Sequence, residues 1–339
     1  MRGSYELVVR NARVQFKLTI RRNITILRGN SATGKTTLID MIADYGRDGE
    51  ESGVLLHCDR PCIVLEGHDW QEHLNRISGS IVFVDEGNRF TASVDFARTA
   101  AATDNYFVIA TRDSLFGLPY SVTEIYGIGN DTRQRYQGVW RYYSSSRLLY
   151  ATNKSGEVLR PDGLRQPGVS ETYIPTLVVV EDSGAGFEFF SALFAKKGIA
   201  CVSARGKANV YRTVCQASAD ERVLVIADGA AFGPELERLA SLFDVRDIRL
   251  FLPESFEWLI LRSGLVKSDE LPSILENPVN YIESHEYFSW ERFFTACLVD
   301  MTRGTSLVYS KDHLADSYRQ AKSMDSIAAS VPYADGFGS

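Results

Sequence analysis

Hydrophobic residues along the chain are grouped into short, wholly apolar runs, and the stretches between these runs are amphipathic or polar. The runs are rich in Val and Ile, which is typical of strands buried on both faces of a parallel sheet. They are residues 24–27, 81–84, 106–110, 177–180 and 223–227. Apolar residues at helical spacing occur between them, at residues 38–45, 91–102, 187–194 and 230–242. Strands that alternate with helices predict an α/β fold with parallel sheets.

Other patterns flank this alternation. Residues 5–9 and 14–20 alternate apolar and polar positions on either side of Asn11, which predicts an antiparallel strand pair that leads into strand 24–27. The remaining expected elements are short strands at 54–56 and 63–65, a helix at 69–77, an amphipathic helix with an aromatic stripe at 287–301 and a polar helical segment at 311–330.

The length of 339 residues is large for a single hydrophobic core, so two domains are expected. The composition changes at residues 131–170, where aromatic residues and arginines mix with Ser, Gly and Pro. Turn-forming residues at 160–168 indicate a linker, and we place the two domains at 1–170 and 171–339. The aromatic and basic residues of the linker region either pack as a β-hairpin onto the first domain or stack on single-stranded nucleic acid.

A glycine-rich segment follows the strand at 24–27 and opens the next helix. It reads GNSATGKTT from residue 29, and its first eight residues match G-x-x-x-x-G-K-[ST]. Glycines at both ends let backbone N–H groups turn toward a phosphate, and the positive end of the following helix faces the same group. Lys35 is expected to reach the β- and γ-phosphate oxygens, and the Thr36 hydroxyl to ligate Mg²⁺. The predicted nucleotide-binding residues here are Gly29, Asn30, Ser31, Ala32, Thr33, Gly34, Lys35, Thr36 and Thr37.

Polar residues also follow two other predicted strands of the first domain. The run at 81–84 ends in Asp85 and Glu86, and the run at 106–110 ends in Thr111 and Arg112. Open α/β sheets bind their ligands at the carboxyl ends of the strands. Asp85 is therefore expected at the Mg²⁺ site, Glu86 is expected to polarise the attacking water, and Thr111 or Arg112 is expected to sense the γ-phosphate.

The motifs GNSATGKT and IVFVDE, with the leading strand pair, make residues 5–130 resemble the P-loop ATPases of the ABC/AAA-like branch. That branch includes small ATPase modules of DNA-repair and phage-defence proteins. The resemblance implies ATP and Mg²⁺ as ligands and Lys35 and Glu86 as catalytic residues. The chain has no LSGGQ-type signature, and the roughly fifty residues between the two motifs are too few for a full ABC helical insert. A conventional ABC dimer is therefore not expected.

The second half repeats the pattern of a buried strand with an acid at its carboxyl end. Glu181 follows the run at 177–180, and Asp228 follows the run at 223–227. Strands of an α/β domain gather acids around a divalent metal in this way. A wholly structural role for strand-end carboxylates in an unrelated α/β domain is the alternative.

The stretches VVVEDSGAGFEFF and VLVIADGAAFG make residues 174–262 resemble the Toprim domain of topoisomerases, primases and overcoming-lysogenization-defect type nucleases, a Rossmannoid α/β fold. The resemblance implies acid/base work for Glu181 and binding of Mg²⁺ or Mn²⁺ by Glu181 and Asp228. One departure is Ala230, which stands where that family places a second aspartate, and another is Asp182 in place of a glycine. Either another acid substitutes, or the domain has lost catalysis and serves a binding or regulatory role. The possible substitutes are Asp182, Glu254 and Glu257.

Composition narrows the class further. Hydrophobic residues make up 45% and charged residues 24%, as in an ordinary soluble protein, and no apolar run reaches membrane-spanning length. Five scattered cysteines indicate reduced thiols and a cytoplasmic protein. The net charge of −6 gives no global basic field for nucleic acid, although residues 1–35 and 133–165 are locally basic.

A group of five residues is also a candidate zinc site, but its C-x₃-C spacing lacks a second paired unit. The group is His57, Cys58, Cys62, His68 and His73.

Two functional hypotheses follow. In the first, ATP hydrolysis gates a metal-dependent Toprim-like nuclease, in phage defence or DNA repair. In the second, the protein is an ATP-switched sensor or scaffold whose second domain is inactive and recruits a partner effector. We expect an oligomer in either case, because many P-loop ATPases complete their site with an arginine from a neighbour.

Overall fold

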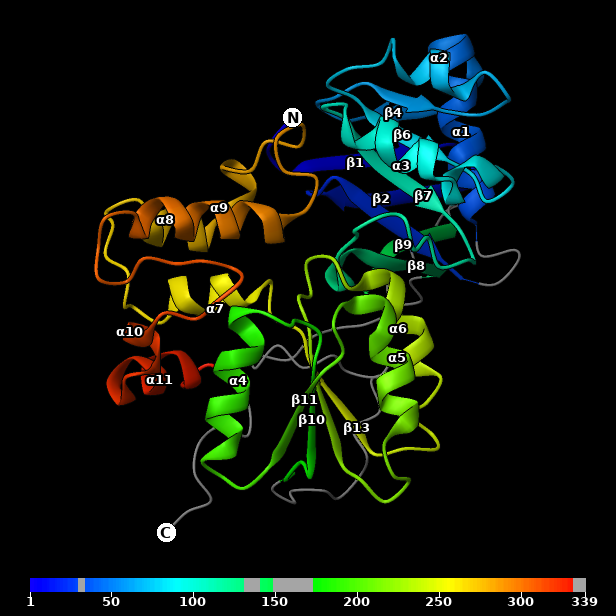
Figure 1. Cartoon of the computed structure of the whole chain (residues 1–339). Coiled ribbons are helices and arrows are strands. Elements are labelled where there is room, and N and C mark those ends of the chain that lie inside the picture. Colours follow the sequence, from blue (N-terminus) through cyan, green and yellow to red (C-terminus); the bar gives the residue numbers. More distant parts are fainter. Residues whose placement is uncertain (30–33, 131–140, 149–172, 332–339) are drawn as a thin grey trace. The chain divides into compact units, whose positions relative to one another are not determined.

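The computed structural model describes residues 1–29, 34–130, 141–148 and 173–331 (Figure 1). The chain divides into two compact units, Met1–Leu149 with Asn277–Ser289, and Tyr150–Glu276 with Trp290–Ser339. Each unit contains a sheet with parallel strands and flanking helices, so the predicted α/β class is confirmed. The predicted linker at 160–168 lies outside the described residues.

The first unit is built on a nine-stranded sheet in the order β4-β1-β2-β9-β8-β3-β7-β6-β5. Its strands are β1 (Tyr5–Arg10), β2 (Val14–Ile20), β3 (Ile24–Arg28), β4 (Leu55–His57), β5 (Cys62–Val64), β6 (Ile81–Val84), β7 (Tyr106–Ala110), β8 (Ile125–Asn130) and β9 (Arg141–Leu148). Strands β8, β3, β7, β6 and β5 run parallel to one another. The predicted antiparallel pairing of β1 with β2 is confirmed, and β4 extends it. Strand β9 joins the two halves by pairing with β2 and β8.

The nine-stranded sheet curls so that its two edges approach each other. Strands β4 and β5 stand at opposite ends of the strand order, yet only residues 58–61 separate them. A flat sheet of this size would hold its edges roughly 38 Å apart. The five Cα–Cα steps of the link span at most about 18 Å. The sheet therefore wraps around its concave face, and α1 (Lys35–Asp48) contacts β1, β4 and β5 there.

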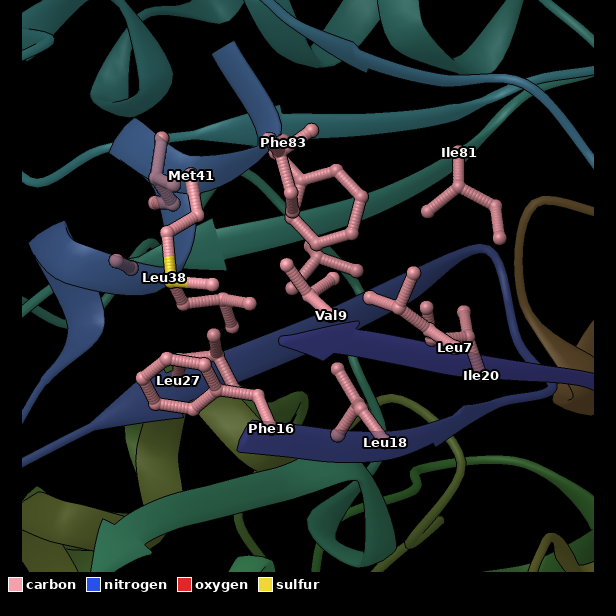
Figure 2. Packing of buried hydrophobic residues seen from close by; sticks show 14 of the residues in the cluster. Leu7, Val9, Phe16, Leu18, Ile20, Leu27, Leu38, Met41, Ile81 and Phe83 are labelled. Carbon is pink, nitrogen blue, oxygen red and sulfur yellow. The ribbon is translucent and has the colours of Figure 1, made fainter. Parts of the chain in front are cut away.

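The main core of the first unit lies between the curled sheet and α1. Leu38 and Met41 of α1 meet Phe16 and Leu18 of β2 and Phe83 of β6, as Figure 2 shows. Residues from both ends of the strand order thus share one buried cluster. Burial of this apolar surface is what holds the antiparallel and parallel halves of the sheet together.

The first unit also has α2 (Trp70–Leu74), α3 (Val94–Ala101) and the short 3₁₀ segments Gly49–Ser52, Arg89–Ala92, Val122–Glu124 and Pro278–Asn280. Phe96 of α3 packs edge-on against Phe107 of β7, with ring centroids 5.7 Å apart. Trp70 stacks on Phe90 at 5.0 Å and completes this second cluster.

Residues 277–289 return from the second half of the chain to the first unit. The Ser284 hydroxyl accepts a hydrogen bond of 2.9 Å from the amino terminus of Met1, and Asn23 Nδ2 donates one of 2.9 Å to the Ser284 carbonyl. Glu283 pairs with the same amino terminus at 3.0 Å. This return was not predicted, because nothing in the local pattern of residues 277–289 marks it.

The second unit is built on a four-stranded, all-parallel sheet in the order β11-β10-β12-β13. The strands are β10 (Leu177–Val180), β11 (Ala200–Ser203), β12 (Val223–Ile226) and β13 (Ile248–Phe251). Helix α4 (Ala185–Ala195) lies on one side of the sheet, and α5 (Lys207–Gln216) and α6 (Gly233–Ala240) lie on the other (Figure 1). The remaining helices are α7 (Phe256–Arg262), α8 (Leu271–Glu276), α9 (Trp290–Thr302), α10 (Asp316–Arg319) and α11 (Ala321–Ala328). Helix α7 packs against α9 and α11.

Several element boundaries differ from the sequence prediction. The helix expected from residue 230 begins at Gly233, because Ala230 and Ala231 form a turn whose N–H groups are bonded to Glu254 and Asp228 carbonyls. The helical segment expected at 311–330 is two short helices separated at Gln320, whose ψ of 141° is extended. Within the described part of the chain, no helix is both long and apolar enough to cross a membrane.

Candidate functional site

The glycine-rich segment connects the end of β3 to the start of α1, as its sequence predicts. Gly29 has a φ of 140° and Gly34 a φ of 101°, a region that residues with a side chain rarely adopt. A Cβ atom on Gly34 would also lie 3.4 Å from the Phe16 ring. Both glycines are therefore required by the backbone path. Asn30, Ser31, Ala32 and Thr33 lie outside the described residues.

Lys35 is the first residue of α1, and its side chain is almost completely buried, with 4% exposure. Its Nζ donates a hydrogen bond of 2.7 Å to the Gly29 carbonyl and lies 3.6 Å from Glu86 Oε2. The lysine thus spans the glycine-rich segment and reaches the acid at the end of β6. Thr36 and Thr37 follow it on the first turn of α1 and are exposed.

Strand β7 lies between β3 and β6, so residues after these three parallel strands share one edge of the sheet. Arg112, after β7, donates a hydrogen bond of 2.8 Å from Nη2 to Glu86 Oε1. Partial burial raises the pKa of Glu86, but the Arg112 hydrogen bond and the charges of Lys35 and Arg112 outweigh it and lower the pKa below its usual value. Glu86 is consequently held as a carboxylate between two cations.

Thr111 and Arg112 are both predicted candidates for sensing a γ-phosphate, and the structure distinguishes them. The Thr111 hydroxyl donates to the Asp113 carbonyl at 3.2 Å and accepts from the Asp113 N–H at 3.0 Å. Thr111 is also buried, and its N–H bonds to Leu27 in β3. It therefore stabilises the turn after β7, whereas the exposed Arg112 side chain pairs with Glu86, the acid that Lys35 also approaches.

Asp85 occupies the first position after β6, and its Oδ1 is buried without a hydrogen-bond partner. An unpaired buried carboxylate oxygen is costly, so this atom fits a site for a cation. Asp40, one turn after Thr36 on α1, has a pKa raised first by burial and then by the charges of Asp85, Asp44 and Glu66. The Thr36 hydroxyl and the Asp85 carboxylate are hard oxygen donors, which suit Mg²⁺.

The second unit places Glu181 and Asp228 at the carboxyl ends of β10 and β12, which are paired neighbours. The Asp228 N–H lies 3.3 Å from Glu181 Oε2, and the Phe256 N–H donates to Asp228 Oδ1 at 3.1 Å. Burial raises the pKa of Glu181 despite the opposing Asp228 N–H. Burial also raises the pKa of Asp228, and the negative charges of Glu291 and Glu181 raise it further. The sequence prediction that these two acids lie together is therefore consistent with the geometry.

Further polar residues of the second unit surround this pair. Glu257 on α7 is 1% exposed; its Oε1 accepts a hydrogen bond of 2.9 Å from the Tyr309 hydroxyl, and its Oε2 has no partner. Lys311 Nζ donates to Glu291 Oε1 at 2.6 Å. Burial opposes the charge on Lys311, but Glu291, Glu257 and Asp228 raise the pKa of its ammonium group above the ordinary value. Sequence reasoning missed Glu291, Tyr309 and Lys311, because no motif links them to the strand ends.

The possible substitutes for the missing aspartate differ in what they do. Asp182 accepts hydrogen bonds from the N–H groups of Ser183, Gly184 and Gly186, so its carboxylate caps the start of α4. Ala230 is buried, and its N–H bonds to the Glu254 carbonyl. Glu257 is the candidate with a buried oxygen still unpaired.

No group of three or more His, Cys, Asp or Glu side chains is assembled for a metal ion within the residues that the structure covers. This finding applies to the histidines and cysteines of residues 57–73, which were considered as a candidate zinc site because they lie close together in sequence. They do not form such a group. The finding applies equally to Glu181 and Asp228, which form a pair of acids without a third ligand in place.

No protein-family model matches the chain, and no curated protein matches it either. The fold and the two sites define the class: an α/β protein in which the parallel strands of each of two sheets carry charged residues at their carboxyl ends.

Proposed function

We propose that the first unit binds ATP with Mg²⁺ and hydrolyses it, as a P-loop NTPase of the ABC/AAA-like branch. One observation carries this proposal: Lys35, Glu86 and Arg112, which follow three adjacent parallel strands, meet beside the glycine-rich segment. The strand ends bring two cations and a carboxylate together beside a segment whose two glycines are required by φ, and such a charged cluster is typical of a functional site.

Each residue has a distinct role in the proposed reaction. Backbone N–H groups between Gly29 and Gly34 hold the phosphates, and Lys35 moves from the Gly29 carbonyl onto phosphate oxygens. Thr36 and Asp85 would hold Mg²⁺, which neutralises the charge of the phosphates when bound. Glu86 is ionised and accepts a proton from the attacking water, and Arg112 transfers its contact from Glu86 to the γ-phosphate.

Two substitutions test this proposal in the full chain. Lys35→Ala should abolish binding of a fluorescent ATP analogue, and Glu86→Gln should retain binding while hydrolysis falls by roughly 10²-fold or more, the range of a lost general base. Lys17→Ala is the matched control, because Lys17 is exposed on β2 and pairs with Glu6 at 2.8 Å. Binding by Lys35→Ala equal to that of Lys17→Ala would refute an ATP site here.

For the second unit we propose a Toprim-like, metal-dependent nuclease centre at Glu181 and Asp228, gated by the ATPase. Two neighbouring carboxyl groups with raised pKa values form a site where Mg²⁺ or Mn²⁺ replaces protons. Phage defence or DNA repair is the setting that we infer for such an enzyme. The protein should cleave DNA or RNA when Mg²⁺ or Mn²⁺ is present. The variant Glu181→Ala should lose this cleavage and should still bind ATP.

Two observations favour a second candidate function for this unit. Lys311 already supplies a positive charge among the acids, and the position of the expected second aspartate is the buried Ala230. An ATP-switched scaffold with an inactive second unit, which recruits an effector, accounts for both. The candidate predicts no cleavage with any divalent metal, together with an ATP-dependent partner that Lys35→Ala fails to capture.

A further inference from the structure

Two of the five cysteines of the chain lie together, in the first unit. Cys58 directly follows β4, and Cys62 is the first residue of β5. Both are half-buried against the core that Figure 2 draws in part. Each of the two thiols alters the pKa of the other. The residues between them, Asp59 to Pro61, are exposed.

The position of this pair follows from the curl of the sheet. Cys58 and Cys62 stand at the two ends of the link that connects one edge strand of the sheet to the other. Arg60 fixes the link: its guanidinium carbon lies 5.2 Å from the centre of the Tyr5 ring, and its carbonyl is 3.6 Å from Cys62 Sγ. The link thus holds both cysteines against the same core.

The chemistry of the pair is that of a dithiol. Within the described residues, neither His57, His68 nor His73 joins it in a group of three metal ligands. Two thiols without a third ligand do not form a closed zinc site, which takes four. Two thiols in contact can instead exchange protons and electrons with an oxidant.

The electrostatics make the two thiols unequal. The hydrogen bond from Cys62, the Arg60 N–H and His57 lower the pKa of Cys58 to about 7, against the opposing effects of burial and Asp59. The contact with Cys58 and burial raise the pKa of Cys62. Cys58 is therefore the thiolate and nucleophile, and Cys62 remains the thiol that donates to it.

We propose that Cys58 and Cys62 form a peroxide-reactive redox site, in which Cys58 is oxidised first and Cys62 then closes a disulfide across the β4–β5 link. The Cys58 thiolate attacks one oxygen of hydrogen peroxide, the O–O bond breaks, and hydroxide leaves and takes up a proton to become water. Cys58 is then a sulfenic acid. The Cys62 sulfur attacks the Cys58 sulfur, the S–O bond breaks, and a second water leaves. Both sulfurs have been oxidised by one electron each, and one peroxide has been reduced to two waters.

A disulfide at this position would tie Cys58, the first residue of the link, to Cys62, the residue that follows the end of the link. Since β5 pairs in parallel with β6 and Cys62 lies opposite Ile81, the bond would fix the start of the edge strand, at the opposite end of β6 from Asp85 and Glu86. The proposal does not depend on ATP binding and is tested without it.

The experiment exposes the full-length protein to a small excess of hydrogen peroxide, alkylates the remaining thiols and measures the masses of the intact protein and its peptides. The wild-type protein should lose two hydrogen atoms and two of its five alkylation sites, both in the peptide that contains residues 58–62. In Cys62→Ser, dimedone should trap a sulfenic acid at Cys58. In Cys58→Ser, Cys62 should remain reduced under the same exposure.

Cys215→Ser is the matched control, because Cys215 is also half-buried and free, and this variant should form the disulfide as the wild type does. Circular dichroism establishes that each serine variant is folded. Equal oxidation of all five cysteines, or full alkylation of Cys58 and Cys62 after peroxide treatment, would overturn the proposal. So would trapping of the sulfenic acid at Cys62 in place of Cys58.

Discussion

Arg112 and Glu86 are joined by a hydrogen bond of 2.8 Å, although they follow different strands and are 26 residues apart in sequence. The bond crosses from the end of β7 to the end of β6, and Lys35 lies 3.6 Å from the other carboxylate oxygen. A phosphate group that enters beside Lys35 competes for both cations. The proposed catalytic base is therefore held by the same side chains that are expected to bind the substrate.

Replacing Arg112 should affect both binding and turnover. Arg112→Ala removes one cation from the phosphate site and one partner from Glu86, so kcat/KM for ATP should fall by about 10-fold or more, or ~1.4 kcal/mol of transition-state stabilisation. Steady-state ATPase kinetics measure this effect. Arg89→Ala is the control, since Arg89 is an exposed arginine in the 3₁₀ segment after β6. A kcat/KM in Arg112→Ala equal to that of this control would remove Arg112 from the site.

Gly34 should not tolerate alanine. Its φ of 101° acts against a side chain, although an added Cβ atom would only touch the Phe16 ring at 3.4 Å, and we expect a loss of about 1–2 kcal/mol in the free energy of unfolding. ATP binding should be lost as well. Gly46→Ala in the same helix is the control, because nothing lies within 4 Å of its added Cβ. That substitution should instead stabilise α1 by about 0.5–1 kcal/mol. Denaturant unfolding distinguishes the two outcomes.

The acid pair of the second unit should make its stability depend on pH. The pKa values of Glu181 and Asp228 are raised on folding, so the folded state binds more protons than the unfolded state. The contribution of these two groups to the stability of the folded state is fully present below a pH of about 4, the ordinary pKa in the unfolded chain. It is lost as the pH rises through their pKa values in the folded state. Asp228→Asn should therefore raise the melting temperature at pH 7, and the gain should disappear near pH 4.

Melting temperatures measured between pH 4 and pH 7 test this pH dependence. A second series of measurements is made with Mn²⁺ added. Mn²⁺ should stabilise the wild type at pH 7 and should not stabilise Asp228→Asn. Asp182→Ala is the control, because the Asp182 carboxylate caps α4 and its removal should destabilise the protein by about 1 kcal/mol at pH 7. A wild-type melting temperature that rises steadily from pH 4 to pH 7 would contradict the assignment of raised pKa values.

The ends of β12 and β13 approach each other too closely for a side chain at Gly229. A Cβ atom there would lie 2.4 Å from the Leu252 carbonyl oxygen. We expect Gly229→Ala to cost about 2 kcal/mol or more, because backbone must shift. Gly198→Ala is the control: φ at Gly198 is 71°, but no atom lies within 4 Å of an added Cβ. This variant measures backbone strain without a clash and should lose less stability than Gly229→Ala. Equal destabilisation by both variants would show that β12 and β13 are not packed in this way.

The sequence was sufficient to predict the strands that carry the candidate sites. Runs such as Ile81–Val84 and Leu177–Val180 are wholly apolar because both of their faces are buried, and an acid follows each of them directly. The edge strand β11 was not predicted, and its residues alternate between exposed and half-buried positions, unlike those of the central strands.

Convergence of side chains from distant segments was not predictable. Nothing local indicates that residues 277–289 rejoin the first unit, or that Glu291 and Lys311 pair near Asp228. The curl that brings the β4 and β5 edges together depends on the order of all nine strands. These features arise from tertiary packing, which single-sequence patterns do not encode.

Nucleotide binding by Lys35→Ala is the measurement that tests the central claim most directly. Titration of the folded variant and of Lys17→Ala with a fluorescent ATP analogue and Mg²⁺ should give saturable binding to the Lys17 variant alone. Saturable binding of equal affinity to both proteins would contradict the account, because the buried Lys35 is the group on which the proposed phosphate site depends.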